Sequence, residues 1–174
     1  MLLIVRGPGV APNSWCHVPV VGYDMLPTFC EWAGMPATAL PHDIEGGSIS
    51  PLLARAGVGT VERPRAEPVF HFPHYQTGDT PHSAIRLGNL KLLKFYEDDS
   101  VKLFDLETDL GERNDLATQR PADTMRLRGR LETYRADVDA QLPTINPQYD
   151  PTRPASPGRR RGGAAKGVNK RERP

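Results

Sequence analysis

The densest run of side chains that could do chemistry in this sequence is acidic and covers residues 102–117, "KLFDLETDLGERNDLA". Its carboxylates are Asp105, Glu107, Asp109, Glu112 and Asp115. Such a run could bind a metal, act as acid and base, or shape a reversal of the chain. An EF-hand calcium loop starting at Asp105 would need Gly at position 6 and Glu at position 12, where Leu110 and Leu116 stand. The pattern therefore favours a structural turn, in which Asp side chains accept backbone N–H groups.

Two of the histidines, His71 and His74, lie in the aromatic stretch "FHFPHY" at residues 70–75. A His-x-x-His spacing could ligate a metal, but Pro73 lies between the two and their rings need not converge in an extended segment. Two ligands are also too few for a closed metal site. Three interpretations stay open for this pair: structural side chains, substrate contacts at the rim of a cleft, or metal ligands.

The sequence has neither a nucleophile elbow nor a phosphate-binding loop. No G-x-S-x-G motif occurs, and "EGGS" at residues 45–48 has no lysine after its glycines. Arg86 and Lys91 are expected on neighbouring strands, where they could meet an anion or remain solvated. Cys16 and Cys30 are too few for a disulfide framework or a zinc site, which leaves buried free thiols, one bridge or a reactive thiol.

Composition divides the chain into a mildly acidic body and a basic tail. Residues 1–151 carry 14 Lys and Arg against 20 Asp and Glu, whereas residues 152–174 carry 8 against one. Residues 151–174 are mostly Pro, Gly and basic residues, so we expect this tail to be disordered. It has no aromatic residues between its charges, which favours a solvated extension over a nucleic-acid partner. No apolar run approaches the roughly 20 residues of a membrane span, and no signal peptide is recognisable.

Apolar periodicity in the second half predicts a small α+β unit. Strands are expected over 68–72, 83–87, 90–96 and 101–106, with tight turns at 88–89 and 97–100. Strands this close in sequence form an antiparallel meander. An apolar stripe of Leu127, Leu131, Tyr134 and Val138 predicts a helix over 121–142 that lies across one face of this four-stranded sheet.

The first half shows shorter elements. Residues 2–5 are typical of a short buried strand, and residues 17–24 of an extended stretch. A helix is expected over 24–34, with Asp24 as N-cap and Gly34 as its stop. Its expected apolar face consists of Leu26, Phe29, Cys30 and Ala33. A short helix within 43–57 would be capped by Ser48 or Ser50 and stopped by Gly57, and the polar segment 58–68 is the predicted subdomain boundary.

Several segments, taken together, resemble one known family. They are "LLIVRGPGVAPNS", "PVVGYDMLPTFCEWAGM", "IEGGSISPLL", "HFPHY" and "SAIRLGNLKLLKFYEDDSVKLFDLETDLGERNDLA". In residue types and order they are similar to the C-terminal part of the type I, formylglycine-dependent sulfatases, which are arylsulfatase-like members of the alkaline phosphatase superfamily. The resemblance covers roughly residues 2–142. It places the acidic run at the turn between the last sheet strand and the C-terminal helix, away from the family's chemistry.

The resemblance implies an α/β, alkaline phosphatase-like sulfatase fold, of which this chain is one part. Residues 1–60 would be the end of the large α/β domain, 61–150 the small C-terminal subdomain and 151–174 the basic tail. The intact enzyme would hydrolyse sulfate esters of a sulfated polysaccharide or glycan, and it would be periplasmic or secreted. His71, His74 and Arg86 are the residues that we expect to contact this substrate.

The sequence also departs from the family pattern. Family members make formylglycine from the Cys or Ser of a C/S-x-P-x-R motif and bind Ca²⁺ through Asp- and Asn-rich motifs. Neither Cys16 nor Cys30 stands in such a motif, so this chain is assigned no catalytic residue and no metal ligand, and alone it is expected to be inactive. Two alternatives stay open: a non-catalytic glycan- or protein-binding module, or a phosphoesterase of the same superfamily.

Overall fold

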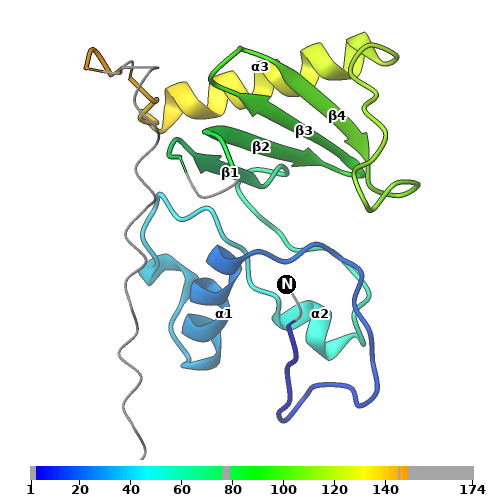
Figure 1. The fold of residues 1–174 in the computed structure, drawn as a ribbon. Helices are drawn as coiled ribbons and strands as arrows, with labels where there is room; N and C mark the ends of the chain where they lie inside the picture. Colours follow the sequence, from blue (N-terminus) through cyan, green and yellow to red (C-terminus); the bar gives the residue numbers. More distant parts are fainter. Residues whose placement is uncertain (1–2, 76–78, 145, 149–174) are drawn as a thin grey trace, which may run out of the picture. The chain divides into compact units, whose positions relative to one another are not determined.

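The computed structural model describes residues 3–75, 79–144 and 146–148 (Figure 1). The chain forms two units, Met1–Pro143 and Thr144–Pro174, and every helix and strand of the described residues lies in the first. The predicted tail, residues 151–174, lies outside the described residues. The division at residue 60 into two sulfatase subdomains stays a prediction.

The second half of the unit is an antiparallel meander, as predicted. Its strands are β1 (Val69–Phe72), β2 (His82–Leu87), β3 (Leu90–Phe95) and β4 (Val101–Asp105), in the order β1-β2-β3-β4. Strands β2 and β3 meet in a two-residue turn because Leu87 pairs with Leu90. Gly88 takes φ 60° in this turn, a left-handed conformation in which a side chain is disfavoured.

The long helix α3 (Pro121–Asp137) covers one face of this sheet and lies behind it in Figure 1. Leu127 and Leu131 are buried against the sheet residues Ile85, Leu92 and Leu103. Burying one Leu side chain contributes roughly 1.5–3 kcal/mol, so this contact is the main apolar core of the unit.

Helix α3 ends at Asp137, five residues before the predicted end at residue 142. Asp139 follows with φ 48°, a left-handed conformation that ends the helix. Val138 is therefore not a core position of the apolar stripe, and its side chain is 45% exposed.

The first half contains a 3₁₀ turn (Gly22–Asp24), α1 (Met25–Trp32), a second 3₁₀ turn (Ala37–Ala39) and α2 (Ser50–Ala54). The predicted strand over 2–5 is absent from its described residues, and Ile4 is 81% exposed. The predicted helix stops are confirmed: Gly34 follows α1 at φ 75° and Gly57 follows α2 at φ 86°, both in left-handed conformations. Neither Ser48 nor Ser50 is the N-cap of α2, because Ile49 occupies that position.

The predicted apolar face of α1 is wrong in this structure. Leu26 and Phe29 are 51% and 56% exposed, while Pro27 and Thr28 point into the protein. The reason is a set of hydrogen bonds on the other face: the Thr28 hydroxyl donates to the Asp24 carbonyl and accepts the Ile49 N–H at 3.0 Å. Satisfying buried backbone groups decides the orientation of this short helix.

We expect Leu131→Ala to lower the free energy of unfolding by about 2–5 kcal/mol, because it leaves a cavity between α3 and the sheet. Urea unfolding followed by circular dichroism measures this. Met125→Ala, on the same helix but 69% exposed, is the control and should change stability by less than about 0.5 kcal/mol. Equal effects of the two substitutions would contradict the assigned core face.

Candidate substrate-binding site

A buried ion pair joins the turn before α1 to the connection that leads into the sheet. Arg63 Nη2 lies 2.6 Å from Asp24 Oδ2, and Arg63 Nε donates to Asp24 Oδ1 at 2.8 Å. The Arg63 and Asp24 side chains are 8% and 0% exposed. Asp24 also accepts the backbone N–H groups of Val21 and Gly47, at 2.8 and 3.1 Å. Each oxygen of this carboxylate therefore accepts two hydrogen bonds, which compensate for burying its charge.

This arrangement corrects the expected role of Asp24. The residue does precede α1, but its side chain makes no capping hydrogen bond to that helix. Burial alone would raise the pKa of Asp24, but the hydrogen bonds from Arg63, Val21 and Gly47 outweigh burial and hold the pKa below its usual value. Sequence reasoning did not single out Arg63, which is one of two arginines, with Arg65, in the proline-punctuated segment 58–68.

The glycines of "EGGS" serve close packing around this pair. A Cβ atom added at Gly47 would lie 2.0 Å from the Glu62 carbonyl oxygen, and one added at Gly46 would lie 2.1 Å from the Tyr23 carbonyl oxygen. Both distances are impossible for real side chains, so these positions require glycine. The "EGGS" segment, a weak candidate for a phosphate-binding loop, is thus a site of close approach to the backbone at Tyr23 and at Glu62.

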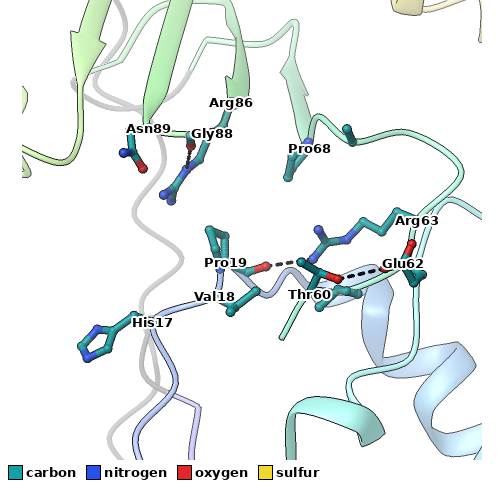
Figure 2. A pocket seen from close by; sticks show the side chains of 12 residues that line it. His17, Val18, Pro19, Thr60, Glu62, Arg63, Pro68, Arg86, Gly88 and Asn89 are labelled. Atoms are coloured by element: carbon teal, nitrogen blue, oxygen red, sulfur yellow. Dashed lines mark hydrogen bonds between the residues drawn. The ribbon is translucent and has the colours of Figure 1, made fainter. Parts of the chain in front are cut away.

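Next to the ion pair lies a pocket of about 470 Å³ (Figure 2). Its walls include Arg63 and Pro19 on one side and Arg86 with the Gly88–Asn89 turn on the other. The Nε atom of Arg86 donates to the Gly88 carbonyl at 3.0 Å. Within the described ranges no carboxylate pairs with Arg86, whereas Arg63 is neutralised by Asp24. Arg86 therefore offers its remaining guanidinium N–H groups to the pocket.

His71 lies on the sheet face that α3 covers, away from this pocket. Its Nε2 is 2.6 Å from the Gln141 carbonyl oxygen, and its Nδ1 is 2.6 Å from Ser83 Oγ and 3.2 Å from the Tyr96 hydroxyl. A carbonyl only accepts, so Nε2 donates to it, and Nδ1 of the neutral ring accepts from one of the two hydroxyls, which also bond to each other at 2.6 Å. Ser83 is fully buried, so this Ser–His pair links strands and carries no exposed nucleophile.

His74 is exposed and follows the end of β1. Its ring lies edge-on to Phe72, with 5.7 Å between the ring centroids. The structure thus separates the three predicted substrate residues: Arg86 in the pocket, His74 at the end of β1, and His71 on the sheet face toward α3. Because both nitrogens of His71 are occupied, the His71–His74 pair offers no ready metal site.

The acidic run forms a structural reversal, as the turn interpretation predicted. Asp115 Oδ1 accepts the N–H groups of Leu103 and Ala117 at 3.0 and 2.9 Å. Asp109 Oδ2 accepts two successive N–H groups at 2.8 Å, and Glu112 pairs with Lys91 at 2.6 Å. These carboxylates therefore stabilise the loop between β4 and α3.

Both cysteines are free thiols, which excludes the predicted alternative of a bridge between them. Cys30 is half-buried, but Cys16 is exposed, so the prediction of a buried thiol is wrong for Cys16. The reason is local, because Cys16 lies in an irregular segment outside any helix or strand.

Comparison with solved structures defines the class of protein. A structure described as being in complex with its substrate D-glucosamine-2-N,6-O-disulfate is similar over 69% of this chain and 24% of its own, with a TM-score of 0.53 and 26% identity. A 2-O glycosaminoglycan sulfatase is similar over 71% of this chain and 27% of its own, with a TM-score of 0.54 and 25% identity. The fold is that of the alkaline phosphatase-like sulfatases.

The family follows from sequence comparison. Residues 1–137 match the family described as N-sulphoglucosamine sulphohydrolase, C-terminal, and the chain belongs to this sulfatase family. N-acetylglucosamine-6-O-sulfatase from Bacteroides thetaiotaomicron is 30% identical over 120 residues, and arylsulfatase K from Danio rerio is 28% identical over 123. These alignments cover 67% and 68% of this chain but only 21% and 22% of the relatives, so the chain spans about a fifth of their length.

No helix in the described part of the chain is both long and apolar enough to cross a membrane.

We expect Asp24→Asn to cost about 3 kcal/mol at pH 7, because it leaves the Arg63 charge buried without its counterion. The lowered pKa of Asp24 means that its contribution is present above the unfolded-state pKa of about 3.9 and is lost as pH falls through the folded-state value. The variant should therefore lose less stability than the parent between about pH 5 and pH 2. Urea unfolding at several pH values measures both effects.

Asp137→Asn is the matched control, because Asp137 pairs with Arg65 at the surface, where the two side chains are 47% and 37% exposed. It should cost less than about 1 kcal/mol. An Asp24→Asn variant with the parent's full acid dependence would contradict the role of this carboxylate.

Proposed function

We propose that this chain is part of an enzyme that hydrolyses sulfate esters of a sulfated glycan. Its family membership over residues 1–137 supports the class of reaction. The observation that carries the proposal for this chain is Arg86, an arginine without a carboxylate partner among the described residues, at the wall of a pocket of about 470 Å³. Guanidinium groups suit sulfate because they present several N–H donors to its oxygens.

The three predicted substrate residues receive different roles in this proposal. Arg86 binds a sulfate group in the pocket, and exposed His74 contacts the sugar. His71 acts as a positioning residue: it fixes β1, the strand that leads to His74, to Ser83 and to the Gln141 carbonyl. Its two occupied nitrogens argue against direct contact with substrate.

Family resemblance implies formylglycine and Ca²⁺ in the intact enzyme. Among the described residues, no group of three or more His, Cys, Asp or Glu side chains is placed to hold a metal ion. Neither cysteine stands in C-x-P-x-R. The described residues therefore offer neither group a fitting set of side chains, and no reaction step of either group is assigned to them. A periplasmic or secreted location for the intact enzyme stays a prediction from the resemblance.

A non-catalytic binding module is the second candidate, because the sequence lacks the C/S-x-P-x-R motif. The phosphoesterase alternative has fold-level support alone: a phosphonate monoester hydrolase from Silicibacter pomeroyi is similar over 76% of this chain and 28% of its own, with a TM-score of 0.56 and 21% identity. Comparing the affinity of the Arg86 pocket for a sulfate ester with its affinity for a phosphate ester distinguishes a sulfatase from a phosphoesterase.

We expect glucosamine 6-sulfate to bind the chain weakly, at about millimolar Kd, and to shift the NMR signals of Arg86 and Asn89. Arg86→Gln should weaken this binding about fivefold or more, because the pocket loses its unpaired cation. Lys91→Gln is the control, since Glu112 already neutralises Lys91. Equal binding of glucosamine 6-phosphate would favour the phosphoesterase alternative, and no change with Arg86→Gln would contradict the pocket assignment.

We also expect the purified chain to release no sulfate from a fluorogenic aryl sulfate, with or without added Ca²⁺, because it lacks the nucleophile motif. Release of fluorophore with time, measured against buffer and against boiled protein, is the test. Turnover that scales with protein concentration and survives repurification would show that other residues of this chain can catalyse the reaction.

A further inference from the structure

Strand geometry gives the sheet a second face with a distinct composition. Side chains alternate between the two faces of a strand, and the residues paired with Leu92 and Ile85 point toward α3. The alternate residues form what we call the open face, which Figure 1 shows on the side away from α3. Its rows are Phe70, Ala84, Leu93 and Lys102; Phe72, His82 and Phe95; and Arg86, Lys91 and Phe104.

The open face is cationic. It carries Arg86, Lys91 and Lys102, and none of its strand positions is an Asp or Glu. Two carboxylates reach it from loops, because Glu112 pairs with Lys91 and Asp79 lies 3.5 Å from His82. Within the described ranges Arg86 and Lys102 have no carboxylate partner, so a net positive charge remains on this face.

The same face is aromatic. Phe72, His82 and Phe95 are direct neighbours across three strands, with ring centroids 6.3 and 5.9 Å apart. Lys102 Nζ lies 5.6 Å from the Phe95 ring centroid, so charge and ring are combined at one end of this row. His74 meets Phe72 at the other end.

Part of this surface is accessible to a ligand. Phe70 is 52% exposed, Lys102 is exposed, and the three rings of the row are half-buried. A single exposed Phe is ordinary on a protein surface, but a contiguous aromatic patch beside unpaired cations suits a ligand or partner.

We propose that the open face binds a sulfated sugar, with pyranose C–H groups on the rings of Phe70, Phe72 and Phe95 and a sulfate group at Lys102. Aromatic faces offer apolar area with a negative quadrupole, which suits the polarised C–H groups of a sugar. Cations beside them select a sulfated sugar over a neutral one. The proposal rests on the function proposed above and extends it, because His74 at the end of the row would contact one sugar and the open face the next.

Charge complementarity favours this occupant over a second copy of the chain. Two open faces brought together would oppose Arg86 and Lys102 with like charges, which is unfavourable at an interface. An apolar protein segment would have to bury the same unpaired cations, at the cost of desolvating them.

The test is an NMR titration of the full chain with a heparin tetrasaccharide and with neutral chitotetraose. Lys102→Gln should weaken heparin tetrasaccharide binding about threefold to tenfold, and Phe70→Ala about threefold, because each removes one ligand contact. Arg113→Gln is the control for charge, since Arg113 is an exposed cation on the loop after β4. Phe29→Ala is the control for the ring, since Phe29 is 56% exposed on α1. Both controls should leave the affinity within about 1.5-fold.

The parent chain should show shifts at Phe70, Phe95 and Lys102 with the sulfated sugar and much weaker ones with chitotetraose. Shifts confined to Arg86 and His74 would overturn the open-face site and leave the proposed function standing. Shifts confined to residues 152–174, unchanged by Lys102→Gln, would mean that the basic tail alone binds the polyanion and would also overturn it. Dimerisation lost on Phe70→Ala without sugar would assign the face to a second copy. Absence of any binding would count against both proposals.

Discussion

Apolar contact between α3 and one face of the sheet determines where the other side chains of residues 69–105 can lie. Leu127 and Leu131 bury Ile85, Leu92 and Leu103, and a slip of one residue in any strand would turn those side chains to solvent. The register is therefore strongly fixed. Since neighbouring residues on a strand point to opposite faces, the same contact places His71 on the sheet face toward α3 and Arg86 on the opposite face.

A second constraint is the Asp24 carboxylate, which organises the first half, whose described residues form no apolar cluster like the one between α3 and the sheet. It gathers the turn before α1, the Gly46–Gly47 segment and Arg63 around one buried charge. The pocket is next to this charge, and Arg63 is one of its walls. One wall of the pocket is thus fixed by electrostatics and the opposite one by the Gly88 turn, whose geometry the sheet determines.

The sequence predicted the sheet and α3 well because alternation, turn residues and a helical apolar stripe all agreed there. The acidic run was also predictable, since the spacing of its carboxylates failed as a calcium loop and suited backbone capping. The orientation of α1 was not predictable, because hydrogen bonds from Thr28 and Asp24 to a distant segment outweighed its apolar pattern. For the same reason nothing local marked Arg63 as the partner of Asp24, 39 residues away. The grouping of Arg86, Lys91 and Lys102 on one face required the strand register, which composition does not provide.

The hydrogen bonds around His71 have a consequence for the segment that follows α3. Nε2 donates to the Gln141 carbonyl, while Nδ1 lies among the hydroxyls of Ser83 and Tyr96 on the other side of the ring. Strand β1 is at the edge of the sheet and has β2 as its one neighbouring strand. The His71 ring therefore gives this edge strand a second attachment, to a backbone carbonyl 70 residues further along the chain. Separating the segment after α3 from the sheet would break that attachment and loosen the edge strand as well.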